Sequence, residues 1–86
     1  MPTVTIRYWA AAKQAAGVAE ETLSAATLAE ALAAAQSKRS PARELEAVLA
    51  RSSFLVDGEQ AGRRHPGEVA LRDGAVIEVL PPFAGG

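Results

Sequence analysis

The absence of cysteine from this chain of 86 residues excludes disulfides, thiolate metal sites and a cysteine nucleophile. Its formal net charge is −1, with acidic and basic residues interspersed, so the sequence lacks the basic footprint of a nucleic-acid-binding protein. No apolar run approaches the ~18 residues of a membrane span and no basic-then-apolar leader opens the chain, so we expect one small, soluble, cytoplasmic domain.

The opening residues predict a strand, a short helix and a second strand. Apolar and polar side chains alternate from Thr3 to Trp9, which is typical of a half-buried strand and directs Trp9 outward. Residues 10–16 are expected to be helical, because the run ends at Gly17, a residue type that commonly terminates helices. Residues 18–23 then predict a more polar strand that pairs back on the first one.

Two longer helices are expected between residues 27 and 51. Thr27 and Glu30 have the spacing of a capping box, which predicts a helix that runs to about Ser37. Ser40 and Pro41 have the pattern of an N-cap followed by proline at the first helical position, which predicts a second helix. The expected apolar faces are Leu28, Ala31, Leu32 and Ala35 in the first helix and Leu45, Val48 and Leu49 in the second.

Turn signals separate the strands that are expected in the second half of the chain. Residues 53–56 predict a third strand, and Asp57-Gly58 favours a tight reversal into a short return over residues 59–62. Residues 63–68 are expected to form an irregular connection, with Leu71 filling the core beneath it.

The last predicted strand, residues 75–80, follows a turn at Asp73-Gly74. Glu78 marks one set of its alternating side chains as facing solvent, so Leu80 is expected to be exposed, like Trp9. The order of these elements predicts an α+β domain with helices on one face of a mixed sheet.

The last six residues, Pro81 to Gly86, are predicted to form an extended tail beyond a domain of residues 1–80. Proline cannot donate a backbone hydrogen bond, so Pro81 and Pro82 should end the last strand and favour an extended continuation. The six residues can span at most about 20 Å and finish on the small pair Gly85-Gly86. A carboxylate on so thin a tether suits a group that enters another protein's active site, whereas the alternative is a frayed chain end.

No combination of side chains in the sequence predicts a catalytic site. His65 is the only histidine and lies in a polar turn, so we interpret it as structural or surface-exposed. The isolated Asp-Gly pairs predict turns and do not form a glycine-rich phosphate-binding loop. We therefore expect a protein that is not an enzyme and holds no metal or cofactor of its own.

The order of elements and the closing sequence from Leu80 to Gly86 resemble the ubiquitin-like β-grasp sulfur carriers of the MoaD/ThiS family, over the whole chain. The most specific parts are Asp73-Gly74, the strand that follows it and the Pro-Pro-x-Ala-Gly-Gly end. His65-Pro66, the aromatic-rich opening strand and the second helical segment, residues 40–51, are similar to the small subunits of molybdopterin synthase.

The resemblance implies that the Gly86 carboxylate is the reacting group. In such carriers an E1-like adenylating enzyme uses ATP to make an acyl-adenylate, and sulfur from a donor then replaces AMP to give a thiocarboxylate. In the molybdopterin branch the tail inserts into the large catalytic subunit of molybdopterin synthase, for molybdenum cofactor biosynthesis. The residues expected to thread the partner's channel are Pro81, Pro82, Phe83, Ala84 and Gly85, and those expected to dock it are Trp9 and Leu80.

Three other functions are compatible with these residues. A sulfur carrier for thiazole (thiamine) or cysteine biosynthesis would share the fold and the tail chemistry and would differ in its partner. A ubiquitin-like protein modifier would use the same activation but would be joined through Gly86 to lysines of other proteins. A passive β-grasp binding module would not depend on the Gly-Gly ending.

Overall fold

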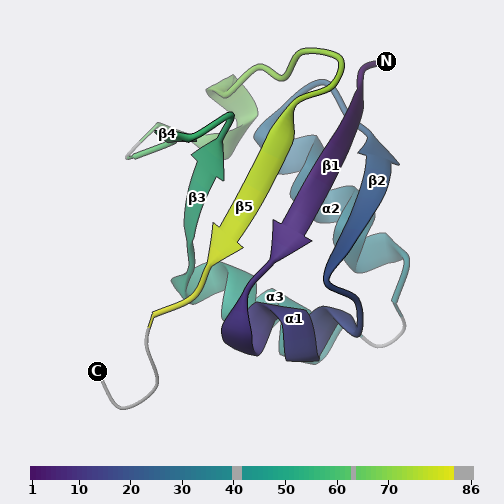
Figure 1. Cartoon of the computed structure of the whole chain (residues 1–86), viewed down its shortest axis with the longest axis vertical. Helices are drawn as coiled ribbons and strands as arrows, with labels where there is room; N and C mark the ends of the chain where they lie inside the picture. Colours follow the sequence, from purple (N-terminus) through teal and green to yellow (C-terminus); the bar gives the residue numbers. More distant parts are fainter. Residues whose placement is uncertain (40–41, 63, 83–86) are drawn as a thin grey trace.

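Five strands form one mixed sheet in the computed structural model, which describes residues 1–39, 42–62 and 64–82 of the chain (Figure 1). The sheet order is β2-β1-β5-β3-β4. The strands are β1 (Thr3–Tyr8), β2 (Glu20–Ser24), β3 (Ser53–Val56), β4 (Glu59–Gln60) and β5 (Val76–Leu80). β1 and β5 run parallel at the centre of the sheet, and the other neighbouring pairs are antiparallel.

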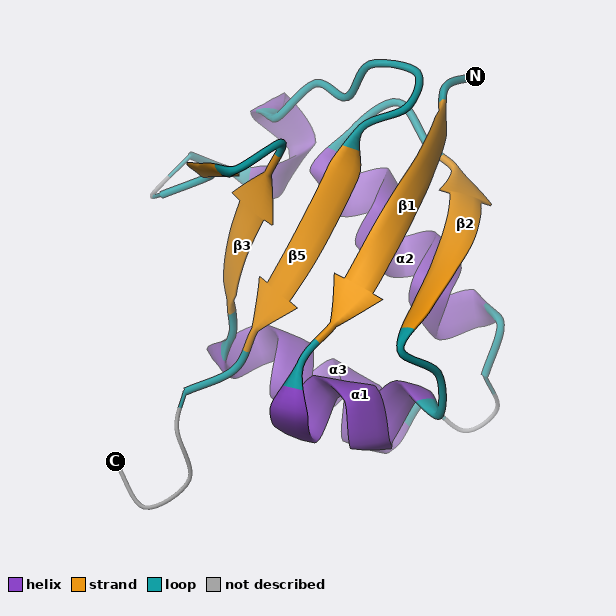
Figure 2. Ribbon diagram, viewed as in Figure 1, coloured by secondary structure: helices purple, strands orange, loops and turns teal. Residues whose placement is uncertain are grey.

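Helices cover one face of the sheet and leave the other face open (Figure 2). They are α1 (Ala10–Ala16), α2 (Leu28–Ser37), α3 (Arg43–Arg51) and the short 3-10 helix η1 (Pro66–Glu68). In the view of Figure 2, α2 lies behind the strands, α1 and α3 lie at the lower edge of the sheet, and the open face points toward the viewer. The architecture confirms the predicted α+β fold and is the ubiquitin-like β-grasp arrangement.

The core lies between the sheet and the helices, where the alternation of side chains predicts it. The central strands contribute five side chains that are at most 2% exposed: Val4, Ile6, Tyr8, Ile77 and Val79. The helices contribute the buried residues Leu28, Ala31 and Ala35 from α2 and Leu45, Val48 and Leu49 from α3, while Leu32 is partly buried. Leu71 is buried, as expected.

The boundaries of α2 are those that the capping box predicts. The Glu30 N–H donates to Thr27 Oγ1 at 3.2 Å, and the Glu30 carboxylate accepts from the Ala26 N–H at 2.8 Å. The first bond satisfies a backbone donor that a helix start leaves without an intrahelical partner, and the second ties the Glu30 side chain back to the residue before the N-cap. The local signal is therefore sufficient to define where this helix begins.

Other boundaries differ from the predictions by one to three residues. β2 begins at Glu20, not at residue 18, because the chain must return from a left-handed Gly17 (φ 82°) to the sheet, where the Ala19 carbonyl accepts from the Tyr8 N–H at 2.8 Å. α3 begins at Arg43, with no side-chain cap at its N-terminus; the proposed cap, Ser40-Pro41, lies outside the described residues.

The remaining differences lie at the ends of the shorter elements. β1 ends at Tyr8, so that Trp9 is the N-cap of α1, and β5 begins one residue later than predicted. The return strand pairs only at Glu59–Gln60, and the expected irregular connection contains η1.

Candidate functional site

The open face of the sheet carries four apolar side chains around Glu78, namely Trp9, Leu55, Val76 and Leu80, which we call the apolar patch. In β5 the outward side chains alternate with buried ones, and Val76 and Leu80 are both partly buried. Leu55 pairs in register with Glu78 of the outward set, while its neighbours Phe54 and Val56 pack against the core. Side chains opposite one another in register share a face of a sheet, so the patch spans β3, β5 and the end of β1.

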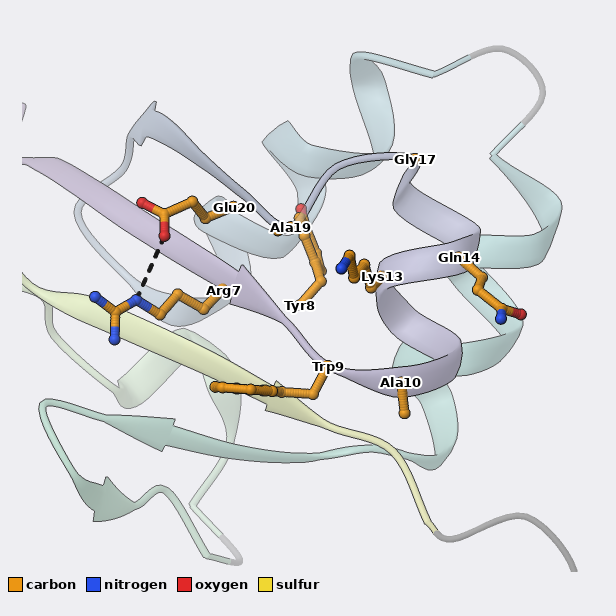
Figure 3. A pocket seen from close by; sticks show the side chains of 9 residues that line it. All are labelled: Arg7, Tyr8, Trp9, Ala10, Lys13, Gln14, Gly17, Ala19 and Glu20. Carbon is orange, nitrogen blue, oxygen red and sulfur yellow. Dashed lines mark ion pairs between the residues drawn. The ribbon is translucent and has the colours of Figure 1, made fainter.

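Trp9 lies at the corner of the sheet where β1 passes into α1. The parallel register pairs Tyr8 with Val79, and the Trp9 N–H donates to the Val79 carbonyl at 3.3 Å. Trp9, the residue after Tyr8, therefore lies beside Leu80, the residue after Val79. Its side chain is 48% exposed, and Figure 3 draws its ring toward β5 and away from α1. The predicted exposure of Trp9 is confirmed.

The predicted exposure of Leu80 is wrong, because this side chain is partly buried. β5 is a central strand, and Leu80 is flanked by Ser53 in register on one side and by Trp9 on the other. Leu55 and Val76 were not among the residues that the sequence predicts for docking. Glu78 already marked Val76 as outward, whereas the continuous apolar run that contains Leu55 gives no alternation from which its direction can be inferred.

The turn that carries Trp9 contains a strained residue. Trp9 is extended (φ −113°, ψ 149°), and the next residue, Ala10, has a left-handed φ of 48°. A left-handed conformation costs a residue with a Cβ atom roughly 1–2 kcal/mol. Contacts elsewhere in the fold must therefore hold this corner in its shape.

An open hollow of about 810 Å³ adjoins the apolar patch between β1, α1 and the start of β2 (Figure 3). The charged residues of its lining are Arg7, Lys13 and Glu20. Arg7 Nε lies 3.7 Å from Glu20 Oε1, but both side chains are about half exposed, so this ion pair contributes little stability. Within the described ranges Lys13 has no ion-pair partner, and the hollow carries one more positive than negative charge.

A polar cluster on the helix-covered side lies directly behind this corner. The Tyr8 hydroxyl donates to Glu21 Oε2 at 2.5 Å, and Arg39 Nη2 lies 3.0 Å from the same oxygen. Burial is the main cause that raises the pKa of Tyr8 well above its ordinary value; its hydrogen bond to Glu21 and the negative charge of that residue act in the same direction, and Arg39 opposes them.

Only the first two residues of the predicted tail lie in the described part of the chain. β5 ends at Leu80, as the two prolines predict; Pro81 is partly buried and Pro82 is exposed. The predicted reacting residue, Gly86, lies outside the described residues, as do the predicted threading residues Phe83, Ala84 and Gly85. Their roles stay predictions.

The described residues offer little else that could form a site. His65 Nδ1 accepts a hydrogen bond from the Gly67 N–H at 3.2 Å at the start of η1, which is a structural use of this side chain. Across residues 1–39, 42–62 and 64–82, no three His, Cys, Asp or Glu side chains gather closely enough to hold a metal ion. In the same ranges no helix combines the length and the apolarity that crossing a membrane requires.

The fold defines a ubiquitin-like β-grasp protein, and solved structures that include the following three share it at low sequence identity. The small archaeal modifier protein 1 of Methanosarcina acetivorans is 24% identical, with 100% of this chain and 98% of that chain covered and a TM-score of 0.83. The putative molybdopterin converting factor subunit 1 of Pyrococcus furiosus is 21% identical, with 96% and 100% covered and a TM-score of 0.75. A complex of subunits 1 and 2 of the molybdopterin-converting factor of Helicobacter pylori contains a chain that is 24% identical, with 98% and 99% covered and a TM-score of 0.67.

The chain belongs to the ThiS family, which it matches over residues 6–86. No curated protein matches it. Its class is therefore that of the ThiS-family sulfur carriers and ubiquitin-like modifiers, which are not catalytic and bind no cofactor themselves. Proteins of this family work with an E1-like activating enzyme.

Proposed function

We propose that this protein is a sulfur carrier that acts through the carboxylate of Gly86, as the small subunit of molybdopterin synthase. The observation that carries the proposal is the position of the apolar patch at the root of the tail. Leu80 belongs to the patch and is followed directly by Pro81, and Trp9 lies beside Leu80. A partner that docks on the patch would therefore meet the start of the tail in the same event.

The chemistry follows from the weakness of a carboxylate as an electrophile. The activating enzyme joins a Gly86 carboxylate oxygen to the α-phosphorus of ATP, and pyrophosphate leaves. Sulfur from a donor at the oxidation level of sulfide then attacks the acyl carbon, and AMP leaves with the oxygen that joined it to the carbonyl. The product is a thiocarboxylate, whose ionised sulfur is a good nucleophile at neutral pH.

This chain supplies recognition and delivery for both partners. Trp9, Leu55, Val76 and Leu80 offer an apolar surface of the kind that is enriched at the centre of protein interfaces. Residues 81–86 act as the thread, with glycine at the last two positions because a narrow channel leaves no room for side chains. The activating enzyme and the large subunit would use the same patch in turn, so their binding would be mutually exclusive.

The choice of the molybdopterin branch rests on sequence features shared with its small subunits. These are His65-Pro66, the aromatic pair Tyr8-Trp9 and the helix that follows α2, which is α3. Two of the solved structures with this fold are described as subunits of a molybdopterin converting factor. We also propose a cytoplasmic location, where ATP and the activating enzyme would be available.

The proposal is tested by incubating the protein with its E1-like enzyme, ATP and a sulfur donor and measuring the mass of the intact chain. We expect a gain equal to the difference between sulfur and oxygen. Adding the large subunit of molybdopterin synthase and the sulfur-free precursor of the dithiolene should then return the carrier to its original mass and yield the dithiolene product. A carrier for thiazole or cysteine synthesis would gain the sulfur but would not release it to this subunit. A modifier would instead form isopeptide-linked conjugates, and an unchanged mass in all incubations would exclude a carrier.

A further inference from the structure

Arg39 joins four segments of the chain from within the helix layer. Its Nε donates to the Ala16 carbonyl at 3.0 Å, at the end of α1, and its Nη1 donates to the Ala35 carbonyl at 2.5 Å, in the last turn of α2. Its Nη2 lies 3.0 Å from Glu21 Oε2 in β2, and its guanidinium carbon is 5.7 Å from the centre of the Tyr8 ring in β1. The side chain is only 16% exposed. We call these contacts the Arg39 clamp.

The Arg39 clamp holds both ends of the segment that carries Trp9. Tyr8 directly precedes Trp9, and Ala16 is the last residue of the helix that Trp9 caps. α1 has seven residues and only one fully buried side chain, Ala12. Helices shorter than roughly 12 residues are marginal without tertiary contacts, and the left-handed Ala10 adds strain at the start of this one. The conformation of the corner therefore depends on contacts such as those of Arg39.

We propose that Arg39 is a positioning residue for partner docking: it fixes the β1–α1 corner so that Trp9 is presented in the conformation that the E1-like activating enzyme recognises. This inference rests on the proposed function. Arg39 approaches the corner from the helix-covered side and lines neither the apolar patch nor the adjoining hollow. It would act on the partner only through the segment that it holds.

Two substitutions of Arg39 can separate its positioning role from its contribution to the stability of the whole domain. Arg39→Met keeps an apolar stem of similar length and removes the hydrogen bonds to both helix ends. Glu21 would still accept from the Tyr8 hydroxyl and would keep Lys38 Nζ at 3.9 Å, so it would not become an unpaired buried charge. Removing one partner of a buried ion pair destabilises most when the remaining charge is left uncompensated, so these remaining contacts of Glu21 should limit the loss of stability. Arg39→Lys keeps the charge but lacks the planar fork that serves several acceptors at once.

A matched control is provided by the adjacent residue. Lys38→Met also removes one positive charge near Glu21, but Lys38 Nζ donates to the Thr22 carbonyl and has no hydrogen bond to α1. Trp9 is the only tryptophan in the chain, so its fluorescence anisotropy reports the corner alone. Amide hydrogen exchange of residues 11–17 reports the stability of α1, and thermal melts report the whole domain.

The decisive measurement is the steady-state kinetics of ATP-dependent thiocarboxylation with the E1-like enzyme that activates the wild-type protein. For Arg39→Met we expect the KM for the carrier to rise about 3- to 30-fold, the range for substitutions that change coupling without touching the ligand. The kcat should be unchanged, because Gly86 is intact. Exchange in α1 should be faster and the anisotropy of Trp9 lower, with Arg39→Lys intermediate and Lys38→Met like the wild type.

The inference is overturned if the KM of Arg39→Met stays at the wild-type value, whatever its melting temperature. It is also overturned if the KM rises while hydrogen exchange in α1 and the anisotropy of Trp9 do not change. If Arg39→Met does not fold, Arg39→Lys measured below its melting temperature decides by the same criteria. A wild-type protein that the enzyme does not activate would instead overturn the proposed function and, with it, the inference built on it.

Discussion

Replacing Trp9 with alanine should weaken partner binding strongly and stability moderately. The side chain is 48% exposed, so roughly half of its surface is already buried in the free protein and the other half is available to a partner. A tryptophan has about 200 Å² to bury, so each half corresponds to about 100 Å². At about 25 cal/mol per Å², each half is worth at most about 2.5 kcal/mol.

The expected losses are smaller than these upper limits. Alanine keeps part of the contact within the domain, so we expect the free energy of unfolding to fall by about 1–2 kcal/mol. For a domain of this size that corresponds to a decrease of roughly 5–15 °C in melting temperature. In the complex we expect a loss of about 2 kcal/mol, which raises the Kd for the activating enzyme roughly 30-fold.

The assay is calorimetric titration of the activating enzyme at a temperature where both proteins are fully folded, together with thermal melts of each variant. Val18→Ala is the matched control, because Val18 is 41% exposed but belongs to the α1–β2 connection, outside the apolar patch. It should leave the Kd within about twofold of the wild-type value, as most peripheral truncations do. If Trp9→Ala raises the Kd no more than Val18→Ala does, the apolar patch is not the docking surface.

Three further predictions concern the tail, a turn and a buried hydroxyl. Deleting Gly86 should abolish thiocarboxylate formation and leave the unfolding free energy unchanged; wild-type product by mass would exclude the mechanism. Asp57→Ala should lower the unfolding free energy by about 2 kcal/mol, because Asp57 Oδ1 accepts from the Val76 N–H at 2.9 Å and the backbone of Asp57 has a left-handed φ of 52°. Asp57→Asn should lose less, because asparagine keeps the acceptor and tolerates this φ. If denaturant melts show the same loss of unfolding free energy for Asp57→Ala and Asp57→Asn, this prediction is contradicted. Tyr8 is the only tyrosine, and its pKa is raised above 10.0 first by burial and then by its bond to Glu21, so ionising it costs more in the folded protein. Stability should therefore be independent of Tyr8 below pH 10.0 and fall as the pH rises further. Tyrosinate absorbance that appears at pH 10.0 in the folded protein would refute this.

Local sequence signals were sufficient for most elements of the fold. The capping box at Thr27 and Glu30, the helix end at Gly17 and the reversal at Asp57-Gly58 each depend on residues within a few positions of one another. The sheet order could not be predicted in this way. The parallel pairing of β1 with β5 depends on contacts such as the bond from the Thr3 N–H to Asp73 Oδ1 at 2.8 Å, between residues 70 positions apart.

The candidate site was predictable only where alternation was clear. Trp9 was expected to face outward because apolar and polar side chains alternate along β1. The partial burial of Leu80 depends on neighbours contributed by two other strands, which the sequence alone does not identify. Arg39 gave no signal, because it lies in a short polar stretch after α2, and its partners Ala16 and Glu21 come from distant parts of the chain.

The parallel pairing of β1 and β5 also limits where a partner's active site can lie. The two strands end at the same edge of the sheet (Figure 1). Trp9 and the root of the tail are therefore neighbours, as the bond from the Trp9 N–H to the Val79 carbonyl shows. In an antiparallel pair, Trp9 would lie at the other end of β5, roughly 17 Å away for a strand of five residues. Residues 81–86 can span at most about 20 Å, so a partner bound to the apolar patch must hold its reactive site within about that distance of Leu80. A complex in which the patch is covered but the reactive site lies much farther away would show that docking and sulfur transfer use different surfaces.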